Sequence, residues 1–108
     1  MKILICEDEL SLSENLAVIL RSEGVSAEAA EPSELEAAIY RYEPDAVLLN
    51  EKHIGSQSCI PEDITLILTS SDSTFCHAER PQHILIKPYD GSMLIELLHD
   101  IADGENER

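Results

Sequence analysis

The chain has 108 residues, of which 44% are hydrophobic, so it is long enough to form one domain with a buried core. Its 22 acidic and 7 basic residues give a net charge of −15, which disfavours direct binding to nucleic acid and favours partners with basic surfaces. No apolar run approaches the length of a membrane span, and the N-terminus lacks the pattern of a signal peptide, so we expect a cytoplasmic protein without membrane contact.

Short apolar runs alternate with amphipathic segments along the chain, a pattern typical of a parallel α/β sheet. The first predicted strand covers residues 2–6. A helix is predicted to begin at Ser11, where the sequence Ser-Leu-Ser-Glu fits a capping box. It ends at Gly24, because glycine tolerates the left-handed conformation that follows a helix. Helical spacing predicts that its buried residues are Leu12, Leu16, Ile19 and Leu20.

The segment 26–30 predicts a second strand, and its small, partly polar residues place it at a sheet edge. Pro32 suits the first turn of a second helix. The helix stops at Glu43, because the residue before a proline, here Pro44, is disfavoured in a helix. Its predicted buried residues are Leu35, Ile39 and Tyr42.

Three further strands are predicted over 46–49, 64–69 and 84–86. The segments 51–64 and 70–83 join them, and both are close to the minimum of about a dozen residues for a parallel crossover. Neither segment shows a helical stripe, so we expect shortened or missing helices after the third and fourth strands.

The last helix is predicted to begin at Asp90 or Ser92 and to end by Gly104, ahead of a charged tail. Its predicted buried residues are Leu94, Leu97, Leu98 and Ile101. Residues 1–108 therefore form one domain in this interpretation. We expect a flavodoxin-like, doubly wound, five-stranded parallel sheet with the strand order 2-1-3-4-5.

The cysteines and histidines do not indicate a disulfide framework or a zinc site. Cys6 lies in an apolar strand and is predicted to be a core residue. The remaining candidates for zinc ligands match no familiar ligand spacing. They are His53, Cys59, Cys76 and His77. The histidines His53, His77, His83 and His99 are expected to face solvent.

Polar residues follow the carboxyl ends of four predicted strands. Glu7 and Asp8 follow the first strand, and Asn50 follows the third. Thr69 closes the fourth strand, and Lys87 follows the fifth. Ligands of open parallel sheets bind beyond the carboxyl ends, where the strand order reverses. We therefore expect these five residues to meet in one pocket.

Four segments of the chain resemble the response-regulator receiver domain of two-component signalling. They are residues 2–9 (KILICEDE), 44–50 (PDAVLLN), 66–70 (LILTS) and 86–89 (IKPY). The segments occur in the order that the family has, and the resemblance covers nearly the whole chain. The combination is more specific than any one of the motifs.

The resemblance implies a role for each residue of the expected pocket. Asn50 matches the aspartate that the family phosphorylates, and Glu7 and Asp8 match its Mg²⁺ ligands. Thr69 and Lys87 match the residues that bind phosphoryl oxygens. The acidic pair still offers hard oxygen ligands, and Thr69 and Lys87 still offer a hydroxyl and a positive charge.

Departures from the family pattern indicate that the phosphorylation chemistry is lost. The amide of Asn50 is a poor nucleophile and removes one negative charge from the Mg²⁺ site. Ile54 and Gly55 stand where the family has proline and glycine, and Ile84 stands at its aromatic switch position. We expect no cofactor, and weak Mg²⁺ binding at a vestigial site on Glu7 and Asp8 is the one possibility left open.

Lys52 lies two residues after Asn50, in the loop that faces the metal in the family. We hypothesise that its ammonium neutralises Glu7 and Asp8 without Mg²⁺. The alternative is a solvated loop lysine. Plain structural roles also stay open for the pocket residues: helix capping by the acids, a strand end at Thr69 and an ordinary ion pair at Lys87.

We interpret the chain as a degenerate receiver, or pseudo-receiver: a non-enzymatic protein-interaction module of two-component-type signal transduction that works without phosphorylation. Its expected partners are a sensor kinase, another regulator or an effector domain. The expected contact surface is the first helix, or the strand 84–86 with the last helix, and the latter pair is also a possible homodimer interface.

Two alternatives remain open. In the first, the chain is an active phospho-accepting receiver in which Asn50 is an engineered replacement of the acceptor aspartate. In the second, it is a flavodoxin-like module that binds a small ligand or nucleotide. The short crossovers and Ile84 argue against the first. The lack of a glycine-rich phosphate loop after residues 2–6 argues against the second.

Overall fold

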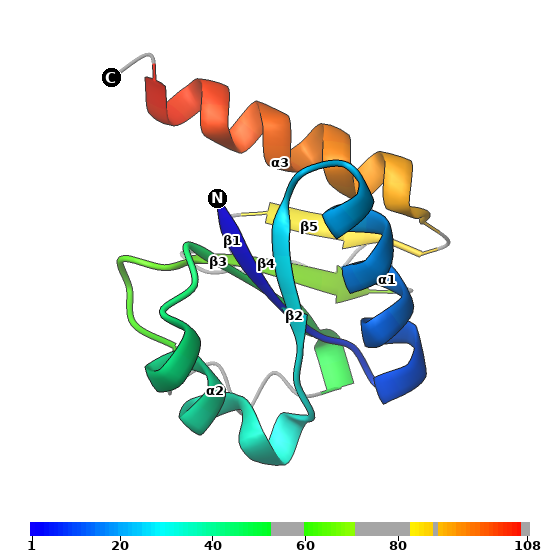
Figure 1. The fold of residues 1–108 in the computed structure, drawn as a ribbon, viewed down its shortest axis with the longest axis vertical. Coiled ribbons are helices and arrows are strands. Elements are labelled where there is room, and N and C mark those ends of the chain that lie inside the picture. The colour runs from blue at the N-terminus through cyan, green and yellow to red at the C-terminus, as the bar shows by residue number, and fades with distance from the viewer. Residues whose placement is uncertain (53–59, 71–82, 88, 107–108) are drawn as a thin grey trace.

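The computed structural model describes residues 1–52, 60–70, 83–87 and 89–106 (Figure 1). All five predicted strands are present, with ends within one residue of the prediction. The elements are, in chain order, β1 (Lys2–Cys6), α1 (Leu10–Ser22), β2 (Ser26–Ala29), the 3₁₀ helix η1 (Pro32–Glu34), α2 (Leu35–Tyr42), β3 (Ala46–Asn50), β4 (Thr65–Ser70), β5 (His83–Ile86) and α3 (Gly91–Asn106).

The five strands form one parallel sheet in the order β2-β1-β3-β4-β5, which confirms the predicted fold class and the edge position of β2. The chain moves outward from β1 to β2 and then returns to the other side of β1 to form β3. The strand order therefore reverses between β1 and β3. A crevice at the carboxyl ends of these two strands is where such sheets bind ligands.

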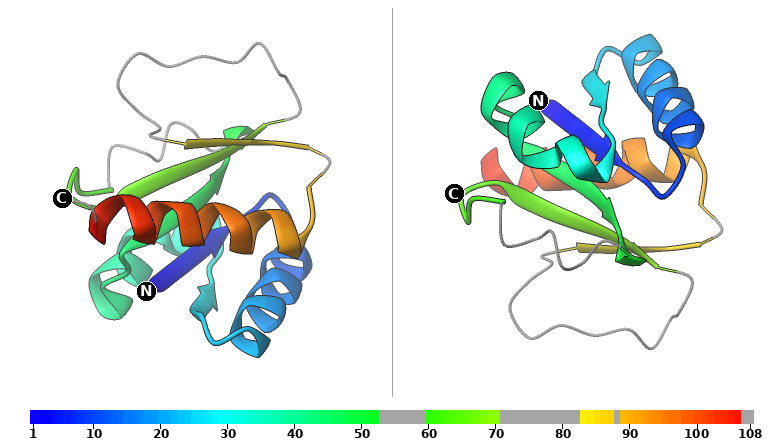
Figure 2. Two further views of the ribbon diagram at one scale, coloured as in Figure 1. Left: turned by 90° about the horizontal axis from the view of Figure 1, so that it is seen from above. Right: turned by 90° about the horizontal axis from the view of Figure 1, so that it is seen from below.

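Alternate residues of the central strands supply two separate apolar layers, because side chains of a strand point to opposite faces of the sheet. Ile5 and Leu48 belong to the layer under α1 and α3, whereas Leu4 and Val47 belong to the layer under α2. Figure 2 shows α1 and α3 together on one face and α2 on the other. Burial on both faces explains why β1, β3 and β4 are nearly continuous apolar runs.

The predicted capping box at the start of α1 is wrong. The helix begins at Leu10, and Glu9 occupies the N-cap position without a side-chain capping bond. Ser13 is buried, and its hydroxyl accepts a hydrogen bond from the backbone N–H of Glu7 at 2.9 Å. This hydroxyl therefore serves the loop after β1, and Ser11 lies inside the helix as an exposed residue.

The buried face of α1 also differs from the predicted one. Leu16 and Leu20 are buried as expected, but Leu12 is 36% exposed and Ile19 is 41% exposed. Ser13 and Ala17 are buried in their place. Helical spacing predicts a stripe but does not fix how far the helix is rotated, and small residues at 13 and 17 face the sheet.

The ends of the other helices combine confirmed and corrected predictions. Pro32 begins η1, a 3₁₀ turn that leads into α2. Asp90 caps α3, since its Oδ1 accepts a hydrogen bond from the N–H of Met93 at 2.9 Å. The prediction that α3 ends by Gly104 is wrong, because the helix continues to Asn106.

The buried faces of α2 and α3 largely match the prediction. Leu94, Leu98 and Ile101 are buried as predicted, whereas Leu97 and Tyr42 are only partly buried.

Cys6 is fully buried and His99 is exposed, as predicted. His83 was expected to face solvent, but it begins β5 and is half-buried, and this burial lowers the pKa of its imidazole. The remaining predictions fall wholly or largely outside the described residues. They concern helices in the two crossovers and the residues His53, Ile54, Gly55, Cys59, Cys76 and His77.

Within the described ranges, every helix falls short of the length and apolarity that crossing a membrane requires.

Candidate functional site

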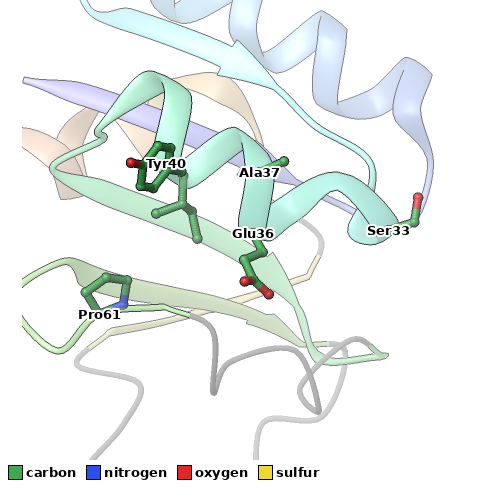
Figure 3. A pocket seen from close by; sticks show the side chains of 6 residues that line it. Ser33, Glu36, Ala37, Tyr40 and Pro61 are labelled. Atoms are coloured by element: carbon green, nitrogen blue, oxygen red, sulfur yellow. The ribbon is translucent and has the colours of Figure 1, made fainter.

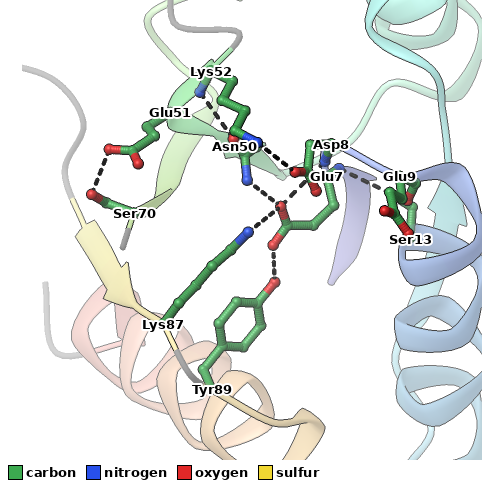
Figure 4. A network of polar contacts seen from close by, with 10 residues as sticks. All are labelled: Glu7, Asp8, Glu9, Ser13, Asn50, Glu51, Lys52, Ser70, Lys87 and Tyr89. Atoms are coloured by element: carbon green, nitrogen blue, oxygen red, sulfur yellow. Dashed lines mark hydrogen bonds and ion pairs between the residues drawn. The ribbon is translucent and has the colours of Figure 1, made fainter. Parts of the chain in front are cut away.

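A polar network joins the carboxyl ends of β1 and β3 to the segment that follows β5 (Figure 4). Glu7 and Asp8 follow β1, Asn50 ends β3, and Lys87 follows β5. These four predicted site residues are all in the network. Thr69 lies beside them, because it pairs with Asn50 in the ladder between β3 and β4.

Glu7 is the centre of this network, and its side chain is fully buried. Its Oε1 accepts a hydrogen bond from Asn50 Nδ2 at 2.6 Å and lies 3.5 Å from Lys87 Nζ. Its Oε2 accepts a hydrogen bond from the hydroxyl of Tyr89. A buried carboxylate is costly unless donors and an opposite charge meet it, and both are present here.

Asn50 is 1% exposed, and both ends of its amide are used. Nδ2 donates to Glu7, and Oδ1 accepts a hydrogen bond from the backbone N–H of Lys52 at 2.9 Å. An aspartate in the same place has no N–H to donate. Its oxygen would face the carboxylate of Glu7 at close range, which is repulsive unless a proton or cation separates the two groups.

Lys52 follows β3 and pairs with Asp8. Its Nζ lies 3.1 Å from Asp8 Oδ2, and the two side chains are 69% and 27% exposed, respectively. The hydrogen bond from Lys52 lowers the pKa of Asp8 below its usual value, and the charge of Lys87 acts in the same direction. Asp8 is therefore held as a carboxylate next to a lysine ammonium.

Tyr89 is a site residue that the sequence interpretation missed. Tyr89 ends the segment 86–89, and its hydroxyl donates a hydrogen bond to Glu7 from beyond β5 (Figure 4). Burial raises the pKa of this hydroxyl, and the hydrogen bond to Glu7 raises it further. The available signal was its position, since a residue shortly after a strand end lies at the same sheet edge as the pocket.

Two further serines contact residues around the pocket. Ser13 fixes the backbone of Glu7, as described above, and its hydroxyl also donates to the carbonyl of Glu9 at 3.4 Å. Ser70 donates to Glu51 Oε2 at 2.6 Å, which ties the end of β4 to the residue after β3.

The remaining predicted site residues, Thr69 and Ile84, make no polar contact in the network. Thr69 is fully buried, and its Oγ1 has no hydrogen-bond partner in the described part of the chain. Ile84 is half-buried on β5, where it pairs with Leu68. Among the described residues, Thr69 Oγ1 is therefore a buried polar atom without a partner, which is costly.

The acidic pair does not fit a Mg²⁺ site of the kind that the resemblance implies. Mg²⁺ needs carboxylate oxygens that are free to coordinate it. Both oxygens of Glu7 already accept hydrogen bonds, and Asp8 is paired with Lys52. Across the described ranges, no three His, Cys, Asp or Glu residues are grouped so that they could hold a metal ion.

No protein-family profile matches the chain. No curated protein sequence matches it either. Solved structures do match. A CheY-like response regulator receiver domain from Methylobacillus flagellatus is 19% identical with a TM-score of 0.75, over 94% of this chain and 98% of that chain.

Two longer proteins contain a similar domain. NtrX from Brucella abortus is 21% identical with a TM-score of 0.76, and the match covers 98% of this chain but 28% of NtrX. The anti-anti-sigma factor PhyR from Bartonella quintana is 15% identical with a TM-score of 0.77, over 98% of this chain and 49% of PhyR. At these identities the likeness shows a shared receiver-type fold, and the activity of the chain has to be inferred from its own residues.

Proposed function

We propose that the chain is a receiver-like signalling domain that binds protein partners without being phosphorylated and without catalysing a reaction. The observation that carries this proposal is the state of Asn50. It is a buried amide at the place of the acceptor, and it donates a hydrogen bond to Glu7. The partners are proteins such as a sensor kinase, another regulator or an effector domain.

The chemistry of an amide supports the loss of phosphorylation. Acyl phosphate formation needs a carboxylate that attacks phosphorus, and the nitrogen lone pair of an amide is delocalised and its oxygen is a weak nucleophile. Asn50 Oδ1 also accepts the N–H of Lys52, so it is already engaged. Among the described residues, Glu7, Asn50 and Lys52 bond to groups of the network, whereas Thr69 Oγ1 is the exception.

Lys52 supports independence from Mg²⁺ as well. We infer that its ammonium supplies the positive charge next to Asp8 that a divalent cation would otherwise supply, at a distance of 3.1 Å. Lys87 contributes a second positive charge 3.5 Å from Glu7. The acidic pair is thus neutralised by the chain itself.

The alternative of an active receiver with a replaced acceptor is favoured by one observation. Thr69 Oγ1 is buried beside Asn50 without a partner in the described residues, and Lys87 is close by. A hydroxyl and an ammonium in this arrangement are the groups that bind phosphoryl oxygens. Replacing Asn50 by aspartate restores a carboxylate, so the response of that variant distinguishes the proposed function from this alternative.

The test is an NMR titration of the Asn50→Asp variant with Mg²⁺ and then beryllofluoride, with the unchanged chain as the control. We expect neither protein to show saturable shifts that cluster at Glu7, Asp8, Thr69 and Lys87 and extend to α3. Such shifts in the variant alone would favour the replaced-acceptor alternative. The same shifts in the unchanged chain would overturn the proposed function.

The role of Lys52 is tested by Mg²⁺ binding to Lys52→Ala, measured by calorimetry. We expect tighter Mg²⁺ binding than in the unchanged chain, because the removal of Lys52 frees Asp8 and leaves its charge unpaired. Lys52→Arg keeps the charge and should behave like the unchanged chain. Equal Mg²⁺ affinity in all three proteins would show that Lys52 is only a solvated loop residue.

Partner binding through α1, or through β5 with α3, is part of this proposal, and so is dimerisation through β5 and α3. Exposed apolar residues on these elements support it: Val18 and Ile19 on α1 are 60% and 41% exposed, and Met93 on α3 is 44% exposed.

A further inference from the structure

The outer side of α2 borders a groove that is separate from the polar network. Two adjoining hollows of about 660 Å³ and 610 Å³ share Ile39, Tyr40 and Pro61 in their linings. They lie between α2 and the segment that leads into β4 (Figure 3). We call this feature the α2 groove, and its volume is in the range of sites that hold ligands or short peptide segments.

Tyr40 gives the α2 groove an apolar surface that the fold does not use. Its side chain is 89% exposed, whereas Leu35, Ala38 and Ile39 of the same helix are buried against the sheet. Pro61 lies opposite Tyr40 across the groove (Figure 3). An exposed tyrosine adds little to folding, but tyrosine is among the residues that contribute most when a partner covers it.

The rim of the α2 groove is acidic, and the described residues do not neutralise it by ion pairs. Glu36, Glu43 and Asp63 line it, and all three are exposed. None of the three forms an ion pair within the described residues, in contrast to Glu28, which pairs with Arg41 at 2.7 Å. Figure 3 shows Glu36 directed from α2 toward the segment that carries Pro61.

We propose that the α2 groove binds a basic amphipathic segment of a partner protein. An apolar side chain of that segment packs against Tyr40 and Pro61, and its Lys or Arg side chains meet the acidic rim. We favour a basic partner because its positive charges are complementary to the acidic rim. A second copy of the chain would bring another net charge of −15 against the same acids, and a nucleic acid would be repelled for the same reason.

This inference deepens the proposed function, because it names the kind of partner that an interaction module of this composition takes. It also assigns a surface other than α1 or β5 with α3. The rim residues would steer the encounter, and their contribution falls with ionic strength. Tyr40 would provide the contact that remains at high salt, since packing against an aromatic ring is not screened.

The test uses a synthetic amphipathic peptide about as long as α2, with leucines on one face and lysines on the other. Its binding is followed by NMR at about 150 mM salt, where exposed charges more than about 8 Å apart are screened. We expect saturable shifts confined to α2 and residues 61–64. Tyr40→Ala should weaken binding by at least about tenfold, and Glu36→Gln with Asp63→Asn should weaken it by a smaller factor.

The matched control is Glu14→Gln with Glu96→Gln, which removes two exposed acids from α1 and α3 and should leave the affinity unchanged. A second peptide with glutamates in place of the lysines should not bind. Shifts spread over the whole acidic surface, or equal affinity of Tyr40→Ala and the unchanged chain, would overturn the α2 groove as the site. Peptide binding together with a beryllofluoride response in the unchanged chain would overturn the proposed function alone.

Discussion

Glu7 brings together residues that lie far apart in the sequence. Asn50 supplies an amide donor, Lys87 a positive charge and Tyr89 a hydroxyl donor. Each of these contacts offsets part of the cost of burying a carboxylate. An amide at position 50 suits this arrangement because its Nδ2 donates a hydrogen bond to Glu7. The amide, which in the proposed function stands at the acceptor position, therefore also stabilises the buried acid.

The contribution of the Tyr89 hydroxyl is tested by Tyr89→Phe. This variant removes a hydrogen bond to a buried carboxylate and should lower the free energy of unfolding by about 1.5–3 kcal/mol, as measured by urea denaturation. Tyr40→Phe is the matched control, because the same change at a side chain that is 89% exposed should have no measurable effect. Equal effects of the two variants would contradict the contact.

The raised pKa of Tyr89 predicts a loss of stability at alkaline pH. The folded-state pKa lies above the unfolded value of about 10, so the stabilisation is complete below pH 10 and decreases as the pH rises above it. The unfolded chain then releases a proton that the folded chain keeps. In Tyr89→Phe the decrease between pH 10 and 11, measured by urea denaturation, should be smaller. An identical decrease in both proteins would contradict this assignment.

The helices α1 and α2 are each followed by a residue with a positive φ. Gly24 has φ of 84° after α1, and its N–H and that of Val25 bond to the carbonyls of Arg21 and Leu20 at 3.1 and 3.0 Å. These contacts close the last turn of α1 before β2 begins. Glu43 takes the equivalent position after α2 with φ of 52°, although it has a side chain. The second helix end is therefore the more strained of the two.

Gly24→Ala tests this conformational requirement. Apart from Gly24 and its two chain neighbours, no atom of the described residues lies within 4 Å of the added Cβ. The effect is therefore conformational, and we expect a loss of about 1 kcal/mol in the free energy of unfolding. Gly24→Asn should lose less, because asparagine tolerates the left-handed region better than alanine does. Thermal denaturation of the two variants checks the order, and a stabilising alanine would contradict the assigned conformation.

The whole molecule carries a large excess of negative charge for a chain of 108 residues. Two apolar layers on the faces of the parallel sheet hold the fold together, and the net charge of −15 opposes compaction through self-repulsion. Pairs such as Lys52 with Asp8 and Arg41 with Glu28 offset only a part of this charge. Stability should thus depend on salt.

We expect the melting temperature to rise when NaCl is increased from about 10 mM to about 150 mM, because the screening length falls from about 30 Å to about 8 Å. The increase should level off at higher salt, where repulsion is already screened. Sucrose at matched osmolality is the control for effects unrelated to charge. A melting temperature that is constant or falls over the low-salt range would show that self-repulsion is not significant.

Much of the fold and part of the site could be predicted from local patterns. The strands were located within one residue, because buried parallel strands are short apolar runs with sharp ends. The gathering of Glu7, Asp8, Asn50 and Lys87 also followed from their places after strands. The rotation of α1 could not be predicted in this way, because Ser13 and Ala17 compete with larger apolar residues for the sheet face.

The sequence by itself determined where the strands lie, their apolar character and the amide at position 50, since these depend on neighbours along the chain. Only the tertiary structure decided how the buried charge of Glu7 is met. Its partners Asn50 and Tyr89 lie 43 and 82 positions away, and Ser13 holds its backbone from inside a helix. Their places after strands bring these residues to one edge of the sheet, but which atoms bond to one another depends on how the elements pack.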